Sequence, residues 1–390
     1  MTMATRNEIF GQYKKEYWKA SRKRKGAILD VVCEVTAILR KSAIRKFRRI
    51  QLQGSAREKG RGRPSTYTPD VIAALKYIWD AASEPCGEIL HPMIAEYVAI
   101  FRRDKMWMYS DNATAKLLAM SERTVKRRVG AFLRVRRKKG GMTGTSPSLL
   151  KHIIPIFKGP WSDIPPGSGQ LDTVAHCGST LAGDFIWTVN YTDAATYWSA
   201  LRAQWNKGQM ATVASMEAIV VSVPFPVHGM HPDSGGEFIN WVAKGWCDKR
   251  GIALTRSEPN RKNDNMYVEE RNGHIVRKHL GYARLDCPEV VVVANELYDV
   301  LGRYLNHFRA VRRMASKERV GAKYVRTYEK KAQTPYQRVL AHPGVTDEVK
   351  TRLRAEHETL NPLRLKKDID TLKEKIYQIQ KAARDRDMPQ

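Results

Sequence analysis

Three acidic residues stand in sequence contexts that could support chemistry. Asp172 lies in an apolar Leu-Asp-Thr-Val stretch typical of a strand, and Asp233 lies where a short strand would end in a glycine turn. Glu269 lies about one turn into a predicted helix that Asn265 could cap. Carboxylates gathered from such elements repel one another unless cations neutralise them. Their hard oxygens suit two Mg²⁺ or Mn²⁺ ions, the arrangement used for in-line displacement at phosphorus, so the pattern indicates phosphoryl transfer.

Other polar residues in the same region fit this site less well. Glu270 is the nearest rival for the third ligand, but it would point about 100° away from Glu269 on one helix. His176 and Cys177 are adjacent, so on a strand they would face opposite sides, and we interpret them as packing residues. Three further acids are interpreted as turn or cap residues: Asp184, Asp193 and Glu237.

The elements that would position the three acids follow one another from residue 161 onward. Runs of apolar, β-branched and aromatic residues predict strands around Asp172 and at 184–192, 196–205, 228–232 and 252–257. Helical patterns lie between and after them, at 209–222, 237–250 and from about 265. This order predicts an α/β domain over 161–310, a mixed five-stranded sheet with helices in the order of the RNase H-like fold.

The composition indicates a polyanionic partner. Lysine and arginine outnumber aspartate and glutamate by 68 to 40, which gives a formal charge of +28 and a pI near 10.0. Nucleic acid is the first candidate for such an excess. We find no run of about 18 apolar residues that could span a bilayer, and we expect a cytosolic protein. The five cysteines occur singly, so they suggest neither a disulfide framework nor a zinc site.

The region before the α/β domain has a helical and basic pattern, and it predicts an all-α DNA-binding region with a helix-turn-helix. Residues 1–53 form a first helical segment, whose stretch 40–49 would place cations opposite Ile44 and Phe47. Such a helix could lie in a DNA groove or simply face solvent. The candidate DNA contacts here are Arg40, Lys41, Arg45 and Arg48.

Residues 54–67 have the composition of a basic linker. Its Gly-Arg-Gly-Arg-Pro core resembles an AT-hook, in which Arg61 and Arg63 would follow the minor groove, although a plain basic linker remains an alternative.

Residues 68–136 predict a helical domain that ends in a helix-turn-helix. Ser121 could cap the second helix, and a helical hairpin packed on the preceding helices is the alternative. Its candidate DNA contacts are Arg123, Thr124, Arg127 and Arg128. Residues 137–160 predict a second linker, and 311–390 a basic C-terminal region with a terminal helix.

At its acidic residues the sequence resembles the DDE recombinases, the retroviral-integrase-like superfamily that includes bacterial insertion-sequence transposases. Thirty-five residues separate Asp233 from Glu269, as the D,D(35)E pattern of that family requires. The residues around Asp172 and those before Glu269 look like sequence motifs of one bacterial branch of this superfamily. The resemblance covers nearly the whole chain. One departure is that Ser234 follows the second acid, where the family commonly has asparagine.

The resemblance implies a DNA transposase with an RNase H-like core, in which Asp172, Asp233 and Glu269 hold two Mg²⁺ or Mn²⁺ ions. Such an enzyme binds double-stranded DNA at the element ends and the target, and works as a homodimer or higher oligomer on DNA. Cleavage frees a 3′-hydroxyl that then attacks target DNA. It would act with the bacterial nucleoid, without a membrane partner.

Three cations near the acids could hold backbone phosphates or be ordinary surface charge: Lys262, Arg271 and Arg277. Two other functions remain open. One is an RNase H-like DNA nuclease that cuts without joining, and the other is a transposase-derived DNA-binding regulator with a silent core.

Overall fold

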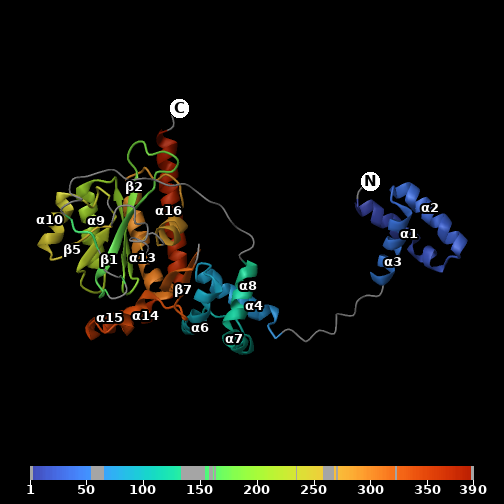
Figure 1. Cartoon of the computed structure of the whole chain (residues 1–390), viewed down its shortest axis with the longest axis horizontal. Helices are drawn as coiled ribbons and strands as arrows, with labels where there is room; N and C mark the ends of the chain where they lie inside the picture. Colours follow the sequence, from blue (N-terminus) through green and yellow to red (C-terminus); the bar gives the residue numbers. More distant parts are fainter. Residues whose placement is uncertain are drawn as a thin grey trace. The chain divides into compact units, whose positions relative to one another are not determined.

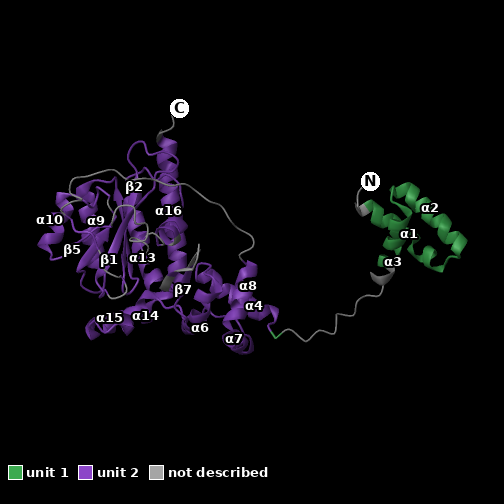
Figure 2. Cartoon of the chain, in the orientation of Figure 1, with its two compact units in different colours: residues 1–66 green, residues 67–390 purple. Residues whose placement is uncertain are grey.

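The computed structural model describes residues 3–53, 66–132, 154–157, 161, 164–233, 235–257, 268, 271–320 and 323–387. The chain forms two compact units, Met1–Thr66 and Tyr67–Gln390, which Figure 2 colours separately. This division is coarser than the six segments expected from the sequence, because residues 68–136 and the α/β domain fall within one unit.

The first unit contains three helices around a small aromatic core. They are α1 (Met3–Lys19), α2 (Arg22–Thr36) and α3 (Arg40–Gln53). Phe47 of α3 packs against Phe10 and stacks on Tyr17, with ring centroids 4.8 and 4.1 Å away. Ala43 and Phe47, four residues apart, form the buried face of α3, whereas Ile44 is 37% exposed. Of the two apolar residues expected opposite the cations, Phe47 is buried and Ile44 is exposed.

The second unit begins with a group of short helices. They are α4 (Pro69–Ala81), α5 (Gly87–Leu90), η1 (His91–Met93), α6 (Ile94–Arg103), α7 (Asp111–Leu118) and α8 (Glu122–Phe132). The backbone N–H of Thr124 donates to Ser121 Oγ at 3.4 Å, so Ser121 caps α8 as expected. Val125 and Val129 of α8 are buried. Two helices joined by a tight turn are present here, and their binding to DNA stays a prediction.

The α/β region is built on a mixed five-stranded sheet, as the sequence predicts. Its strands are β1 (Ser168–Ala175), β2 (Ile186–Asp193), β3 (Ser199–Trp205), β4 (Gly229–Pro232) and β5 (Ala253–Leu254), in the order β3-β2-β1-β4-β5. The pairs β1–β2 and β2–β3 are antiparallel, whereas β1–β4 and β4–β5 are parallel. Mixed strand directions with helical crossovers match the RNase H-like fold that was expected.

Helices cover both faces of this sheet (Figure 1). Leu171, Val189 and Met230 pack with α9 (Gln209–Ser222) and α10 (Trp241–Lys249). On the other face Val174 and Leu201 pack with α13 (Val290–Phe308). Residues on the two faces of β1 therefore pack into two separate apolar cores.

Helix α13 also packs against the helices at the start of this unit. The hydroxyl of Tyr304 on α13 donates to the carbonyl of Ala81 at 2.8 Å, and the hydroxyl of Tyr97 on α6 donates to the carbonyl of Phe308 at 3.3 Å. Apolar residues of α4, α6, α8 and α13 belong to one buried cluster. The helical group and the sheet are thus joined through α13.

The C-terminal region adds a hairpin and three helices. These are β6 (Met314–Val320), β7 (Lys323–Tyr328), α14 (Pro335–Ala341), α15 (Asp347–Thr359) and α16 (Pro362–Asp387), preceded by the π-helical turn η5 (Asn272–Val276) and α12 (Arg277–Leu280) before α13. Leu365, Ile369 and Ile376 of α16 join the cluster around α13, so the terminal helix buries its apolar face within the chain. Among the residues that the structure describes, no helix has both the length and the apolar character to cross a membrane.

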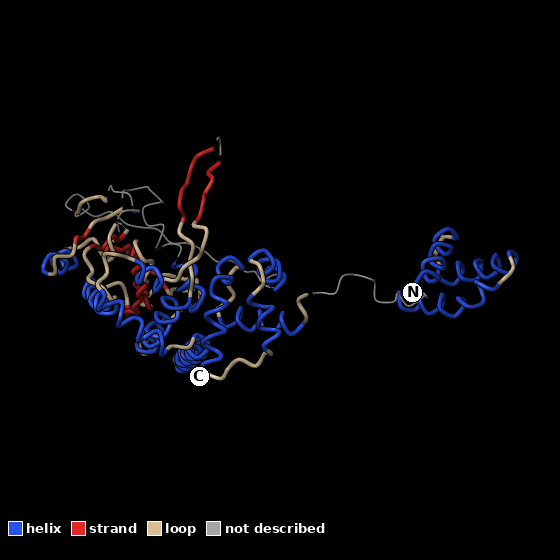
Figure 3. Tube along the Cα trace, turned by 90° about the horizontal axis from the view of Figure 1, so that it is seen from below, coloured by secondary structure: helices blue, strands red, loops and turns tan. Residues whose placement is uncertain are grey.

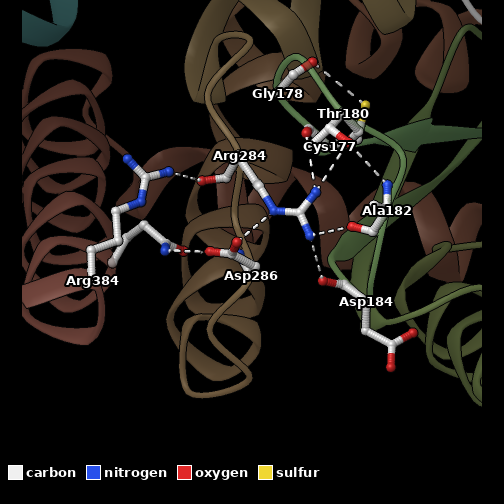
Figure 4. A network of polar contacts seen from close by, with 9 residues as sticks. Cys177, Gly178, Thr180, Ala182, Asp184, Arg284, Asp286 and Arg384 are labelled. Atoms are coloured by element: carbon white, nitrogen blue, oxygen red, sulfur yellow. Dashed lines mark hydrogen bonds and ion pairs between the residues drawn. The ribbon is translucent and has the colours of Figure 1, made fainter. Parts of the chain in front are cut away.

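One arginine holds the connection between β1 and β2 in place. Arg284 donates to the carbonyls of Cys177, Thr180 and Ala182 at 3.3, 3.0 and 2.7 Å, as Figure 4 shows. Its guanidinium also pairs with Asp286. These carbonyl groups, which do not take part in strand pairing, thus accept hydrogen bonds from one guanidinium group. Its planar set of donors fixes the loop that follows β1.

The crossing of α5 and α8 generates a stability prediction. A Cβ added at Gly87 would lie 2.5 Å from the Cα of Lys126, whereas one added at Gly130 of α8 would meet nothing within 4 Å. We expect Gly87→Ala to lower the free energy of unfolding by about 1–3 kcal/mol, because backbone must move apart. Gly130→Ala should leave it unchanged or raise it by about 0.5–1 kcal/mol. Urea unfolding of both variants measures this free energy. An equal loss of stability in the two variants would contradict the close approach of α5 and α8 at Gly87.

Candidate active site

Asp172 lies on β1, and Asp233 directly follows β4, the strand that pairs with β1 in parallel. The β1–β4 register pairs Gln170 with His231 and Leu171 with Pro232, so the next residue on each chain is one of these acids. Neighbouring strands in a sheet are about 4.8 Å apart. The fold therefore brings together two of the three acids that the sequence singled out.

The carboxylate of Asp172 is held by two amide donors. It accepts hydrogen bonds from the backbone N–H of Thr173 at 2.7 Å and from Asn272 Nδ2 at 2.6 Å. Asn190 of β2, directly opposite Asp172 in the register, donates in turn to Asn272 Oδ1 at 2.8 Å. Asn272 was not recognised in the sequence, although it follows Glu269 by three residues, a spacing that shares one helix face.

Asp233 is held by the turn that follows it. Its Oδ1 accepts a hydrogen bond from the backbone N–H of Gly235 at 2.9 Å. A Cβ added at Gly235 would lie 2.8 Å from that oxygen and 2.5 Å from Glu237 Oε2, so a larger residue there would displace these two carboxylates. Ser234, the departure from the family pattern, lies outside the described residues.

Glu237 lies in the turn that follows Asp233, as expected, and its side chain is buried beside the site. Its side chain is 3% exposed, and Oε1 accepts from Thr173 Oγ1 and pairs with Lys207 Nζ, both at 2.8 Å. Lys207 in turn lies over the ring of Trp187, 4.7 Å from its centroid. Since Glu237 is neutralised in this way and its partner Thr173 follows Asp172, we interpret it as a residue that positions β1. Asp193, in contrast, caps a turn as expected, accepting from Thr196 N at 2.8 Å.

The segment that carries the third acid is attached on both sides. Val268 N donates to the buried Gln170 Oε1 at 3.2 Å, and Arg271 Nη2 donates to the Tyr197 carbonyl at 3.2 Å. Glu269 itself lies outside the described residues, as do its rival Glu270 and Lys262. Two neighbours of Glu269 therefore contact β1 and the turn after β2.

His176, near the end of β1, is a packing residue as expected. Burial lowers the pKa of His176 to about 3, with a smaller effect of Arg277 in the same direction. Its Nε2 lies 2.8 Å from Thr188 Oγ1. A neutral, buried imidazole of this kind is unsuited to proton transfer at neutral pH.

The candidate DNA contacts occupy several different environments. On α3, Lys41, Arg45 and Arg48 are exposed, whereas Arg40 pairs with Asp30. Arg61 and Arg63 lie outside the described residues.

The candidates on α8 and near the acids also differ in exposure. Arg123 and Arg127 are exposed on α8, whereas Thr124 and Arg128 are half-buried. Arg277 lies over the ring of Tyr282, 4.9 Å from its centroid. Arg271 is only 5% exposed and lies against Tyr197, so it is a buried structural residue, which corrects its expected place at the DNA surface.

The donor set fits a hard divalent cation as far as it is described. Asp172 on β1 and Asp233 after β4 offer carboxylate oxygens, the ligand type that Mg²⁺ and Mn²⁺ prefer. Among the described residues, which exclude Glu269, no group of three or more His, Cys, Asp or Glu side chains is arranged to hold a metal ion.

The ion pair of Glu237 and Lys207 generates a second stability prediction. Because Glu237 is buried while Lys207 is 39% exposed, we expect a coupling free energy of about 1–2 kcal/mol in a cycle of Glu237→Gln and Lys207→Met. The exposed pair Lys244 and Asp248 on α10, 2.6 Å apart, should give about 0.3–0.5 kcal/mol with Lys244→Met and Asp248→Asn. Unfolding free energies of the wild type and the six variants test this, and similar coupling free energies for both pairs would argue against a positioning role of Glu237.

Comparison with known proteins finds a relative in sequence and a distant likeness among solved structures. No family model matches the chain. The HTLV-2 integrase catalytic core domain, solved in complex with magnesium, aligns with 37% of this chain and 90% of its own, at 15% identity and a TM-score of 0.28. The uncharacterized protein y4rM of Sinorhizobium fredii is 32% identical over 333 residues, which cover 84% of this chain and 93% of that protein. With such identity over most of both lengths, the chain belongs to the y4rM family.

Proposed function

We propose that this chain is a DNA transposase of the DDE type, with Asp172, Asp233 and Glu269 as the ligands of two Mg²⁺ or Mn²⁺ ions. The observation that carries the proposal is the parallel register of β1 and β4, which sets Asp172 and Asp233 next to each other. The spacing of thirty-five residues between Asp233 and Glu269 supports the third ligand.

Glu269 is further supported by its neighbours in the sequence. Asn272, three residues later, donates to Asp172, and Val268, one residue earlier, is bonded to β1 through Gln170. In a helix, residues three apart share a face. A helical Glu269 would therefore face the same strand end as Asn272.

The reaction would be two successive phosphoryl transfers. Water first cleaves a phosphodiester at the element end and frees a 3′-hydroxyl; that hydroxyl then attacks a target phosphodiester, forming one P–O bond as another breaks. Bound metal ions supply Lewis acidity and neutralise the charge that develops on the oxygens. Asn272 orients Asp172, and the Gly235 backbone N–H orients Asp233, so both carboxylates are held before substrate arrives.

Element ends would be bound by exposed cations outside the sheet. Lys41, Arg45 and Arg48 on α3, with Arg123 and Arg127 on α8, are the cations that support this assignment. Because transposition pairs two ends, we expect a dimer or a higher oligomer on DNA, working in the bacterial cytoplasm.

Substitution of the three acids tests the proposal. Asp172→Asn, Asp233→Asn and Glu269→Gln should each lower cleavage and joining of a labelled element-end duplex by on the order of 10³-fold, because a ligand oxygen becomes neutral. Binding of the same duplex should change little, and Glu270→Gln should keep activity. Inverted repeats in the DNA that flanks the reading frame would supply the element-end duplex. Wild-type joining by any of the three acid variants would refute the assignment.

The same assay separates the alternatives. Cutting without joined products indicates a nuclease, and binding without either product indicates a regulator.

A metal-dependent stability shift tests the ligands without any DNA. We expect about 10 mM Mn²⁺ to raise the unfolding midpoint of the wild type, and to raise that of Asp172→Asn or Asp233→Asn much less. Without metal, Asp233→Asn should be no less stable than the wild type, because it removes one of two repelling charges while the amide oxygen can still accept from Gly235. Asp248→Asn on α10 is the matched control. An equal Mn²⁺ shift in all four proteins would show that the acids do not bind the metal.

A further inference from the structure

The hairpin β6–β7 concentrates positive charge on a narrow element. Its two strands contain four lysines and arginines, Lys317, Arg319, Lys323 and Arg326, and one glutamate, Glu318. The antiparallel register pairs Lys317 with Arg326 and Val320 with Lys323. We call these two strands the basic ribbon.

The basic ribbon extends away from the rest of its unit, as Figure 3 shows for the two red strands. Val325 and Tyr328 are 47% and 49% exposed, and Arg326 is exposed as well. A two-stranded hairpin is at best marginally stable alone in water. Apolar and cationic side chains held outward on such an element favour a partner that covers them.

The base of the basic ribbon, unlike its strands, is firmly attached. Arg312 Nε donates to the Glu329 carbonyl at 2.6 Å, and the Arg313 backbone N–H donates to Glu329 Oε2 at 3.0 Å. Arg338 of α14 forms an ion pair with the same carboxylate. Arg313 Nη2 also donates to the Ala194 carbonyl at 2.7 Å, in the turn that follows β2. The ribbon therefore leaves the sheet at a defined place.

The base of the basic ribbon contacts Tyr197, and so does the segment that carries the proposed third acid. The ring of Tyr197 is approached by the guanidinium groups of Arg313 and Arg338, each 5.4 Å from its centroid, and by that of Arg271 at 5.7 Å. Arg271 follows Glu269 by two residues. A ligand held by the basic ribbon would thus be tied, through Tyr197, to the segment of the third acid.

We infer that the basic ribbon is an arm that binds duplex DNA, inserting into a groove next to the proposed active site. This inference rests on the proposed function for the identity of the polyanion. A two-stranded ribbon has the width that the major groove admits, and phosphates supply the complementary charge. A second copy of this chain fits poorly, because its formal charge of +28 opposes that of the ribbon.

Site-specific photocrosslinking tests the arm directly in the full-length protein. Val325→p-benzoylphenylalanine places the probe on the ribbon, and Val292→p-benzoylphenylalanine places it on α13, where the valine is 64% exposed. With a labelled duplex of random sequence, the ribbon position should give a DNA adduct at least about fivefold stronger than the α13 position, because phosphate binding does not depend on sequence. Equal adducts, or a protein–protein adduct from Val325 in place of the DNA adduct, would overturn the inference.

The salt dependence of binding supplies a second measurement. The double variant Lys323→Gln, Arg326→Gln should reduce the slope of log Kd against log salt by about 2, as expected for two lost phosphate contacts. The matched control Lys367→Gln, Lys381→Gln, at two exposed positions on α16, should leave the slope unchanged. Equal slopes for both variants would count against the arm. Neither measurement requires cleavage, so an inactive acidic centre and a ribbon that does not bind DNA are distinguishable.

Discussion

The parallel pairing of β1 with β4 sets the backbones of Asp172 and Asp233 at neighbouring positions, and carboxylates gathered there would repel each other. The backbone hydrogen bonds of the two strands hold this arrangement independently of the side chains. Amide donors complete it: Asn272 on one acid and the Gly235 N–H on the other stabilise the ionised forms without supplying a full positive charge.

Further contacts keep these donors in place. Asn190 orients Asn272 across β1 and β2, while Glu237 connects Thr173 of β1 to the turn after Asp233. Lys207 neutralises Glu237, so that this third described carboxylate adds no further repulsion. Asp172 and Asp233 are therefore held by amide donors, whereas Glu237 is paired with a lysine.

The sequence predicts the sheet well because apolar and β-branched periodicity is a local property, and the five strands lie close to their expected positions. It also singles out Asp172 and Asp233, because the residues on either side of each acid form recognisable short motifs. It does not identify Asn272 or Glu237, because their partners lie 100 and 64 residues away, and a lone asparagine or glutamate carries no trace of such a contact. Arg271 was misplaced for a similar reason, since a cation in the sequence does not reveal the tyrosine that buries it.

Helix α13 explains how the helical region and the sheet can act as one body. Its Tyr304 reaches the end of α4 while other residues of the same helix pack with Val174 and Leu201 of the sheet. Helix α8 belongs to the same buried cluster through Val125. An exposed cation on α8 is thus held at a fixed position relative to the strand ends of β1 and β4. Reactions that need in-line geometry gain most from such rigid placement, since small misplacements cost large factors in rate.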